Sequence, residues 1–123
     1  MRAEEKKLLV DVLEAGQSIR ERCAGHTFEA YTADRWFRRT VEREFEIIGE
    51  ALNRLGRLAP ETAARLTSLR RIVDFRNRII HGYDSVDDII VWRTAEHHLP
   101  GLLAEVEALL GVGADESPSG TGG

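Results

Sequence analysis

Apolar residues recur at intervals of three and four along almost the whole chain, and this spacing constrains the fold more than any other feature. In residues 4–23 the apolar positions on one helical face are Leu8, Leu9, Val12, Leu13, Ile19 and Cys23. In residues 34–55 they are Phe37, Val41, Phe45, Ile48, Leu52 and Leu55. Because this period is that of an α-helix, and no segment alternates for long as a strand does, the pattern predicts an all-α bundle of four to five helices.

Glycine, proline and capping residues mark where these helices should begin and end. Gly25 is the expected stop of the first helix, and residues 26–32 are expected to form a connection. Asp34 suits the N-cap of the second helix, and Gly56 suits its C-terminal stop. Pro60 fits the first turn of a third helical stretch, because its missing N–H costs nothing there.

The second half of the chain carries similar signals. Thr67-Ser68 should divide the third stretch, and Gly82 should end it. The segment from Ser85 to Asp88 resembles a capping box with Asp in place of Glu, which would open the last helical region. Pro100 lies inside that region, so we expect a break near Leu99.

Residues 1–110 are therefore expected to form one helical domain, and residues 111–123 are expected to form a disordered tail. The tail holds five of the chain's 11 glycines together with Ser, Thr and Pro.

A chain of 123 residues with 42% apolar and 31% charged residues fits one soluble domain. No stretch approaches the roughly 18 apolar residues of a membrane span, and no apolar signal-peptide core follows Met1. The lone Cys23 excludes an internal disulfide and a cysteine-based zinc site, so a cytoplasmic protein is expected.

Charge is unevenly distributed along the chain. The net charge is −4, yet residues 34–78 carry eleven arginines against seven acids. That span is therefore basic, at +4, whereas the remainder is acidic, at −8. Arginine pairs bidentately with phosphate or carboxylate, so some of these side chains could converge on an anion, although surface ion pairs between helical residues explain them equally well.

The segment most indicative of chemistry runs from Asp74 to Tyr83. Arg76 and His81 lie about 140° apart around a helix axis, so they are not stacked neighbours. Asn77 lies one turn before His81 and could orient its imidazole. Spacing alone favours a capping histidine over a catalytic one. Together, however, an arginine, a histidine and a phenol suit attack on a phosphodiester.

This segment resembles the motif of HEPN-domain ribonucleases, in which four residues separate an arginine and a histidine and a tyrosine follows two positions later. The HepT-like toxin branch is the most similar. Two further segments support the resemblance: residues 45–52, read as FEIIGEAL, and residues 88–92, read as DIIVW and followed by Leu99-Pro100. The resemblance covers roughly residues 4–110.

The resemblance implies a HEPN-like helical homodimer whose two motifs meet in a cleft on the two-fold axis. Arg76 and His81 would be the catalytic residues of a metal-independent endoribonuclease, in which the ribose 2′-OH attacks the adjacent phosphate. The ribonuclease itself would need no cofactor and no metal. Two copies would supply both a base and an acid, which one histidine cannot do alone.

The resemblance also implies a partner. HepT-like toxins pair with a nucleotidyltransferase antitoxin of the MntA type, which uses ATP and Mg²⁺ to attach AMP to the motif tyrosine, here Tyr83. The chain would then be the toxin of a toxin–antitoxin pair. The alternative is a non-catalytic HEPN scaffold that binds a nucleotidyltransferase, but a scaffold does not need Arg76, His81 and Tyr83 together.

Other polar residues are weaker candidates. Glu46 and Glu50 lie one turn apart and could hold a metal, but ion pairs with nearby arginines are the better interpretation. For Glu50, the resemblance adds a supporting role beside a motif arginine, alongside Asn77 and Tyr83. The RNA-binding candidates are Arg38, Arg39 and Arg78.

Two pairs of residues remain. His97 and His98 are adjacent, so they point about 100° apart on a helix and cannot share a metal ion easily. Trp36 and Trp92 fit a core or a dimer interface, although an exposed ring could stack on a base.

Overall fold

The computed structural model of the chain describes residues 1–80 and 87–111, and every regular element in these two ranges is an α-helix. The helices are α1 (Ala3–Cys23), α2 (Phe28–Ala33), α3 (Arg35–Leu58), α4 (Pro60–Ala63), α5 (Leu69–Ile80), α6 (Asp88–His97) and α7 (Leu99–Leu110). The predicted all-α fold is confirmed. No helix in the described part of the chain is long and apolar enough to cross a membrane.

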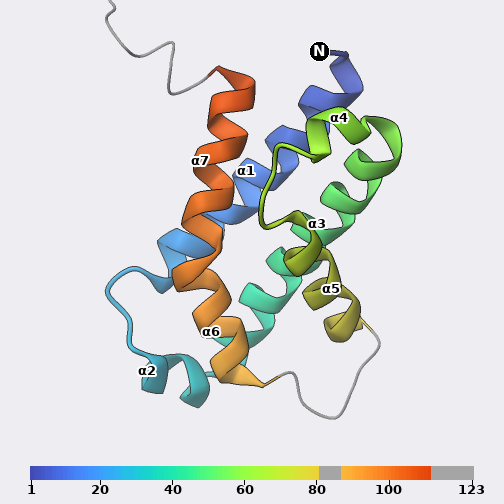
Figure 1. Ribbon diagram of the computed structural model, residues 1–123. Helices are drawn as coiled ribbons and strands as arrows, with labels where there is room; N and C mark the ends of the chain where they lie inside the picture. The colour runs from blue at the N-terminus through green and yellow to red at the C-terminus, as the bar shows by residue number, and fades with distance from the viewer. Residues whose placement is uncertain (81–86, 112–123) are drawn as a thin grey trace, which may run out of the picture.

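The two longest helices, α1 and α3, form the centre of the bundle and run in opposite directions (Figure 1). Helix α5 packs along α3, whereas α7 packs on α1 and continues the line of α6 (Figure 1). The short helix α2 lies at one end of the bundle and α4 at the other. Helix α3 is thus in contact with both α1 and α5, the helix that carries Arg76.

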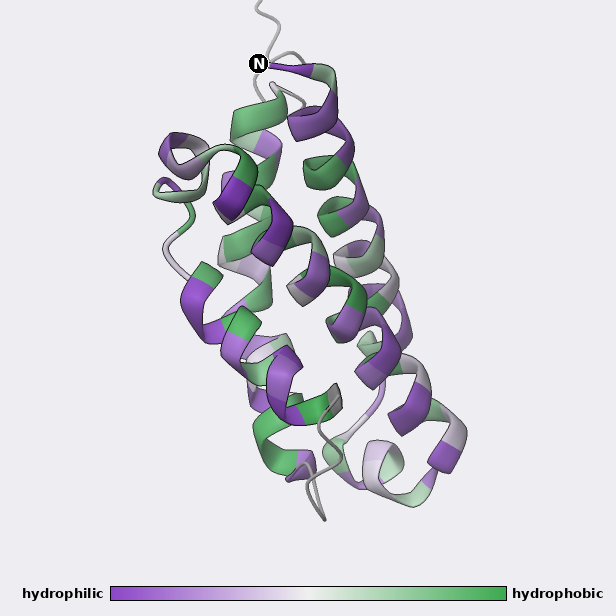
Figure 2. Ribbon diagram, turned by 90° about the vertical axis from the view of Figure 1, so that its right-hand side faces the viewer, coloured by the Kyte–Doolittle hydropathy of each residue, from purple (hydrophilic) through white to green (hydrophobic). Residues whose placement is uncertain are grey.

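Burial follows the helical period seen in the sequence. The largest fully buried side chains include Leu9, Val12, Ile19, Val41, Phe45, Ile48, Leu52 and Leu55. Figure 2 shows hydrophilic and hydrophobic residues on different sides of the helical ribbons. Removing these side chains from water contributes about 1.5–3 kcal/mol each, which is why the apolar stripes fix how the helices face one another.

The expected connection over residues 26–32 is wrong in part, because a short helix, α2, begins within it. Thr27 caps this helix: its hydroxyl accepts a hydrogen bond from the Ala30 amide at 3.1 Å. Tyr31 is fully buried, with its ring centroid 5.4 Å from that of Trp92. The capping hydroxyl and the buried aromatic ring together stabilise a helix too short to persist alone.

The expected stop at Gly56 is also wrong, since α3 continues to Leu58. Gly56 keeps helical geometry, and the helix instead ends at Ala59, the residue before Pro60. Proline disfavours the helical conformation of the residue before it, and this effect outweighs the modest helix penalty of glycine. Pro60 does occupy the first turn of α4, as expected.

The other helix boundaries agree with the sequence except at α6. Asp34 caps α3 by accepting hydrogen bonds from the Trp36 and Phe37 amides at 2.9 and 3.1 Å. The break near Leu99 is present, between α6 and α7.

Asp87 caps α6, accepting from the Ile89 amide at 3.0 Å, so the capping residue is not Ser85. An aspartate directly before the helix can reach its first free amides. Gly82, Ser85 and the tail over residues 112–123 lie outside the described residues.

Candidate active site

Arg76 lies on α5 and its side chain runs against α3. The apolar residues of α5 fix this orientation, because Ile72, Val73 and Phe75 are buried. The Phe75 ring meets the ring of Phe45 on α3 edge to face, with centroids 5.2 Å apart. Burial of these neighbours sets the rotation of α5 about its axis and so directs the next residue, Arg76, along α3.

Gly49 allows the two helices to approach at this point. A Cβ atom on Gly49 would overlap the Cβ of Arg76 and would lie 2.6 Å from its Cγ and 3.3 Å from its Cδ. Any larger residue at position 49 would therefore push against the base of the arginine side chain, which cannot move without α5. A glycine in the middle of a helix predicts the close approach of a neighbouring helix, and the structure shows that the base of the Arg76 side chain occupies this space.

Two neighbours hold the Arg76 guanidinium. Nη2 donates to Glu50 Oε1 in an ion pair with α3, and Nη1 donates to Asn77 Oδ1 at 2.9 Å. The third donor, Nε, is buried and has no acceptor among the described residues. The Arg76 side chain is 19% exposed and that of Glu50 47%. Such a held guanidinium loses little conformational freedom when an anion binds to its outward N–H groups.

A cleft of about 310 Å³ opens beside this ion pair; we call it the Arg76 cleft. Its charged lining residues are Asp11, Arg43, Glu46, Glu50, Arg54 and Arg76. Arg43 pairs with Glu46 on its own helix at 3.2 Å. Arg54 makes no ion pair within the described residues, so its charge is not neutralised by a partner there. Arg54 is thus the cation of this cleft that is available to an anion such as a phosphate.

Several predicted site residues fall elsewhere. His81 and Tyr83 lie outside the described residues. Arg38 is half-buried and donates from Nη1 to the Thr32 carbonyl, so it supports the connection between α2 and α3. Arg39 and Arg78 are exposed. The structure thus brings together Arg76, Glu50 and Asn77, and their roles in a reaction stay predictions.

The remaining candidates are dispersed. His97 is exposed and His98 half-buried, and burial, followed by the nearby Arg71 and His97, lowers the pKa of His98. Within residues 1–80 and 87–111, no three His, Cys, Asp or Glu side chains are grouped as metal ligands would be. Trp92 packs in a cluster with Phe28, Tyr31 and Phe37.

Trp36 differs from Trp92 and is not a core residue of this chain, being 78% exposed. It is the second residue of α3, and its amide donates to the capping Asp34.

Arg43 and Arg54 line the Arg76 cleft, whereas the sequence predicted them only as ion-pair partners of nearby glutamates. A signal was present, because residues 43, 47, 50 and 54 are spaced three and four apart and so share one face of a helix. Which face of α3 meets α5 could not be read from that spacing.

Comparison with known proteins identifies the family. The family model described as "Ribonuclease HepT-like" matches residues 12–109. A Thermococcus cleftensis protein named "Probable ribonuclease HepT" is 33% identical over 89% of this chain and 98% of its own length. A Methanocaldococcus jannaschii protein named as a "Putative RNase" is 27% identical over 85% of this chain and 86% of its own. No solved structure matches significantly. With its all-helical fold and its match over most of its length, the chain belongs to the HepT-like ribonuclease family.

Proposed function

We propose that the protein is a cytoplasmic, metal-independent endoribonuclease and the toxin of a toxin–antitoxin pair. One observation carries the proposal: the motif arginine, Arg76, is held by Glu50 and Asn77 at the edge of a cleft. The same cleft contains Arg54, which makes no ion pair within residues 1–80 and 87–111. A preorganised guanidinium beside a second cation suits a phosphate on which negative charge increases in the transition state. Membership of the HepT-like family agrees with this chemistry.

The proposed reaction is an internal transfer at the RNA phosphate. The ribose 2′-oxygen forms a bond to phosphorus and the bond from phosphorus to the 5′-oxygen breaks, which leaves a cyclic phosphate and a 5′-hydroxyl. His81 takes the proton from the 2′-OH or returns one to the departing oxygen. Arg76 stabilises the charge on the phosphate oxygens. DNA lacks the 2′-OH and is not cut.

The protein acts as a homodimer in this proposal. One histidine cannot be base and acid in the same step, so two copies of Arg76 and His81 across a two-fold axis provide both roles. Arg39 and Arg78 are exposed and are available to the RNA backbone. Arg38 is a weaker candidate, because the Thr32 carbonyl already accepts from its guanidinium.

The test compares wild type with Arg76→Ala and His81→Ala, using purified protein and inducible expression. We expect RNA cleavage to fall at least about 100-fold in both variants, the usual cost of losing a charge-stabilising donor or a proton carrier. Arg70→Ala, an exposed arginine on the same helix, should cut normally. Cleavage should persist in EDTA and release 5′-hydroxyl ends. Cutting that depends on Mg²⁺, or active Arg76→Ala and His81→Ala variants, would contradict the proposal.

Regulation is proposed at Tyr83. A nucleotidyltransferase of the MntA type would join the tyrosine oxygen to the α-phosphate of ATP, with Mg²⁺, and release pyrophosphate. The attached phosphate carries about one negative charge and is close in sequence to Arg76 and His81, so it would compete with the RNA phosphate and repel the backbone.

Tyr83→Phe separates this regulation from catalysis. The variant should keep most of its RNA cleavage, because the phenol is not the proton carrier, yet escape silencing by the partner enzyme and ATP. Intact-mass spectrometry should detect added AMP on wild type only. If wild type gains no AMP, or if Tyr83→Phe is silenced equally, the tyrosine is not the regulated site. A protein that binds the partner but cuts no RNA would be the scaffold instead.

A further inference from the structure

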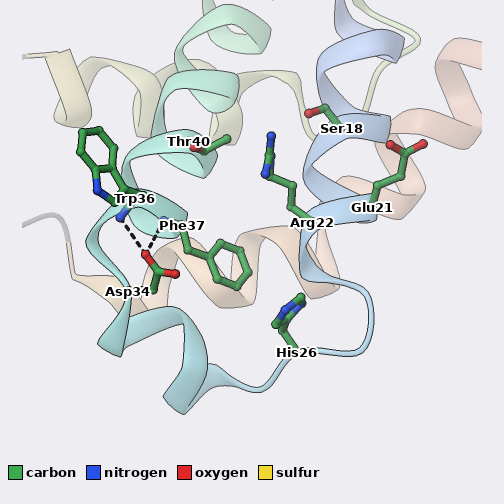
Figure 3. Close-up of a pocket in the computed structure, with 8 residues that line it drawn as sticks. All are labelled: Ser18, Glu21, Arg22, His26, Asp34, Trp36, Phe37 and Thr40. Atoms are coloured by element: carbon green, nitrogen blue, oxygen red, sulfur yellow. Dashed lines mark hydrogen bonds between the residues drawn. The ribbon is translucent and has the colours of Figure 1, made fainter.

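A second hollow lies at the far end of the contact between α1 and α3, between the last turns of α1 and the first turns of α3 (Figure 3). We call it the Trp36 hollow. It measures about 560 Å³, and its lining includes Ser18, Arg22, His26, Trp36, Phe37 and Thr40. None of these residues belongs to the HEPN motif, and the proposed reaction makes no use of them.

The Trp36 hollow contains side chains of the kinds that bind nucleotides. Figure 3 shows the Arg22 guanidinium directed into the space between α1 and α3, with the Phe37 and His26 rings below it. The two rings meet edge to face, with centroids 5.2 Å apart. A guanidinium and hydroxyls bind phosphate or ribose oxygens, and aromatic faces stack with bases.

Each of the two hollows contains an arginine that has no ion pair with another described residue. Arg76 and Arg43, in the Arg76 cleft, are paired with Glu50 and Glu46. Arg22 and Arg54 make no ion pair in the part of the chain that the structure describes. Arg22 lines the Trp36 hollow and Arg54 lines the Arg76 cleft, so each hollow offers a guanidinium to an anion.

The acids of the Trp36 hollow do not neutralise Arg22. Asp34 Oδ1 accepts from two backbone amides of α3 at 2.9 and 3.1 Å. Glu21 points away from Arg22, on the other side of α1 (Figure 3). The guanidinium is thus left available to an anion from outside the chain.

Trp36 supplies the second contact. Its ring is 78% exposed and lies on the side of α3 away from Arg22 (Figure 3). The residues beside it in sequence and one turn further along are the exposed Arg35 and Arg39 and the half-buried Thr40. An exposed indole among cations and a hydroxyl is typical of a nucleic-acid surface, whereas a protein-docking stripe would continue with apolar residues at these positions.

The two hollows lie along one side of α3. Trp36 and Thr40 line the first, and Arg43, Ile47 and Glu50 line the second. These positions are three and four residues apart, so they follow one stripe of the helix. Trp36 and Glu50 are fourteen residues apart, which corresponds to about 21 Å along the axis, a span of several nucleotides.

From these observations we propose that the Trp36 hollow is a subsite for the RNA strand, remote from the reacting phosphate. Arg22 binds a backbone phosphate or ribose there, and a base further along the strand stacks on Trp36, on the other side of α3. The inference rests on the proposed ribonuclease function and extends it: the enzyme holds a strand several nucleotides long and tolerates any base at the stacked position, because every base has an aromatic face.

The test measures binding separately from cleavage. RNA with 2′-O-methyl groups cannot undergo the proposed reaction, so its affinity can be followed by fluorescence anisotropy of an end label. A trinucleotide and a strand of about ten nucleotides are compared on the full chain. For the longer strand we expect Trp36→Ala to weaken binding about tenfold and Arg22→Gln several-fold, and for the trinucleotide no change in either variant. In cleavage of the long strand, KM should rise and kcat should not change.

Two matched variants sharpen the result. Trp36→Phe retains an aromatic face and should recover most of the affinity. Arg20→Gln removes an exposed arginine of α1 that does not line the hollow, and it should bind both strands as wild type does. Quenching of tryptophan emission by the long strand should disappear in Trp36→Phe, because Trp92 lies in the aromatic cluster.

The outcomes distinguish the two proposals. If the long strand binds normally to folded Trp36→Ala and Arg22→Gln, the subsite is absent even if the enzyme cleaves RNA. Equal losses for the trinucleotide and the long strand would also overturn it. A change in sedimentation of Trp36→Ala with unchanged RNA affinity would place Trp36 in a protein interface instead. If wild type binds the long strand through Trp36 but never cuts RNA, the subsite stands and the proposed function fails.

Discussion

Two buried glycines, Gly16 in α1 and Gly49 in α3, let a neighbouring helix approach closely, but the side chains they admit are opposite in kind. A Cβ on Gly16 would overlap the Leu103 side chain of α7, at 3.0 Å from Cδ1 and 3.1 Å from Cγ. A Cβ on Gly49 would overlap the base of Arg76 in α5. The same small residue therefore serves an apolar core contact in one place and a charged side chain in the other.

The two glycine contacts differ in whether the atoms that meet the glycine can move away. Leu103 meets Gly16 with the end of a flexible side chain, which another rotamer can withdraw at the expense of core packing. Arg76 meets Gly49 with its Cβ, which is fixed to the α5 backbone. We infer that the contact at Gly16 contributes mainly to stability, whereas the contact at Gly49 sets the position of a functional group.

The largest expected effect follows from Gly49→Ala. The added methyl group should displace α5 and separate the Arg76 guanidinium from Glu50, and a displacement of about 1 Å can reduce a rate about 100-fold. We expect kcat for RNA cleavage to fall by that order, in a protein that is still folded by circular dichroism. Normal cleavage by folded Gly49→Ala would refute the positioning role.

A smaller effect is expected for Glu50→Gln. The amide keeps the shape of the carboxylate but weakens its hold on Arg76, so cleavage should fall about tenfold, in line with the loss of a charged hydrogen bond. Because the Glu50 side chain is half exposed, stability should change by less than about 1 kcal/mol.

Glu46→Gln is the matched control. It alters the neighbouring ion pair with Arg43, which lines the same cleft but does not contact Arg76. Its kcat should stay that of wild type. Equal losses in the two variants would mean that the total charge of the cleft matters and the contact with Arg76 does not.

The smallest effect on cleavage is expected for Gly16→Ala. Crowding against Leu103 should lower the free energy of unfolding by about 1–3 kcal/mol, measured by urea denaturation. Below its melting temperature the variant should cut RNA as wild type does. If Gly16→Ala and Gly49→Ala lose the same stability and the same activity, the two glycines do not differ in the way we infer.

Helix periodicity predicted the bundle because burial of an apolar stripe decides how a helix lies, and that stripe is visible residue by residue. The same reasoning failed where two local preferences competed. Helix α3 ends just before Pro60 and not at Gly56, because the effect of proline on the preceding residue is the stronger one. Residues 28–33 are helical because Thr27 caps them and Tyr31 is buried. In both places the outcome depends on the relative free energies of competing local interactions, which the spacing of apolar residues does not reveal.

The sequence by itself determined the helical class, the cap at Asp34, the first-turn position of Pro60, the break near Leu99 and the family motif that contains Arg76. Only the tertiary structure decided that Gly49 faces the base of Arg76, that the Arg38 guanidinium donates to a backbone carbonyl, and that Trp36 is exposed while Trp92 is packed. The reason is physical: spacing along a helix shows which residues share a face, but the partner of that face is set by packing between helices distant in sequence.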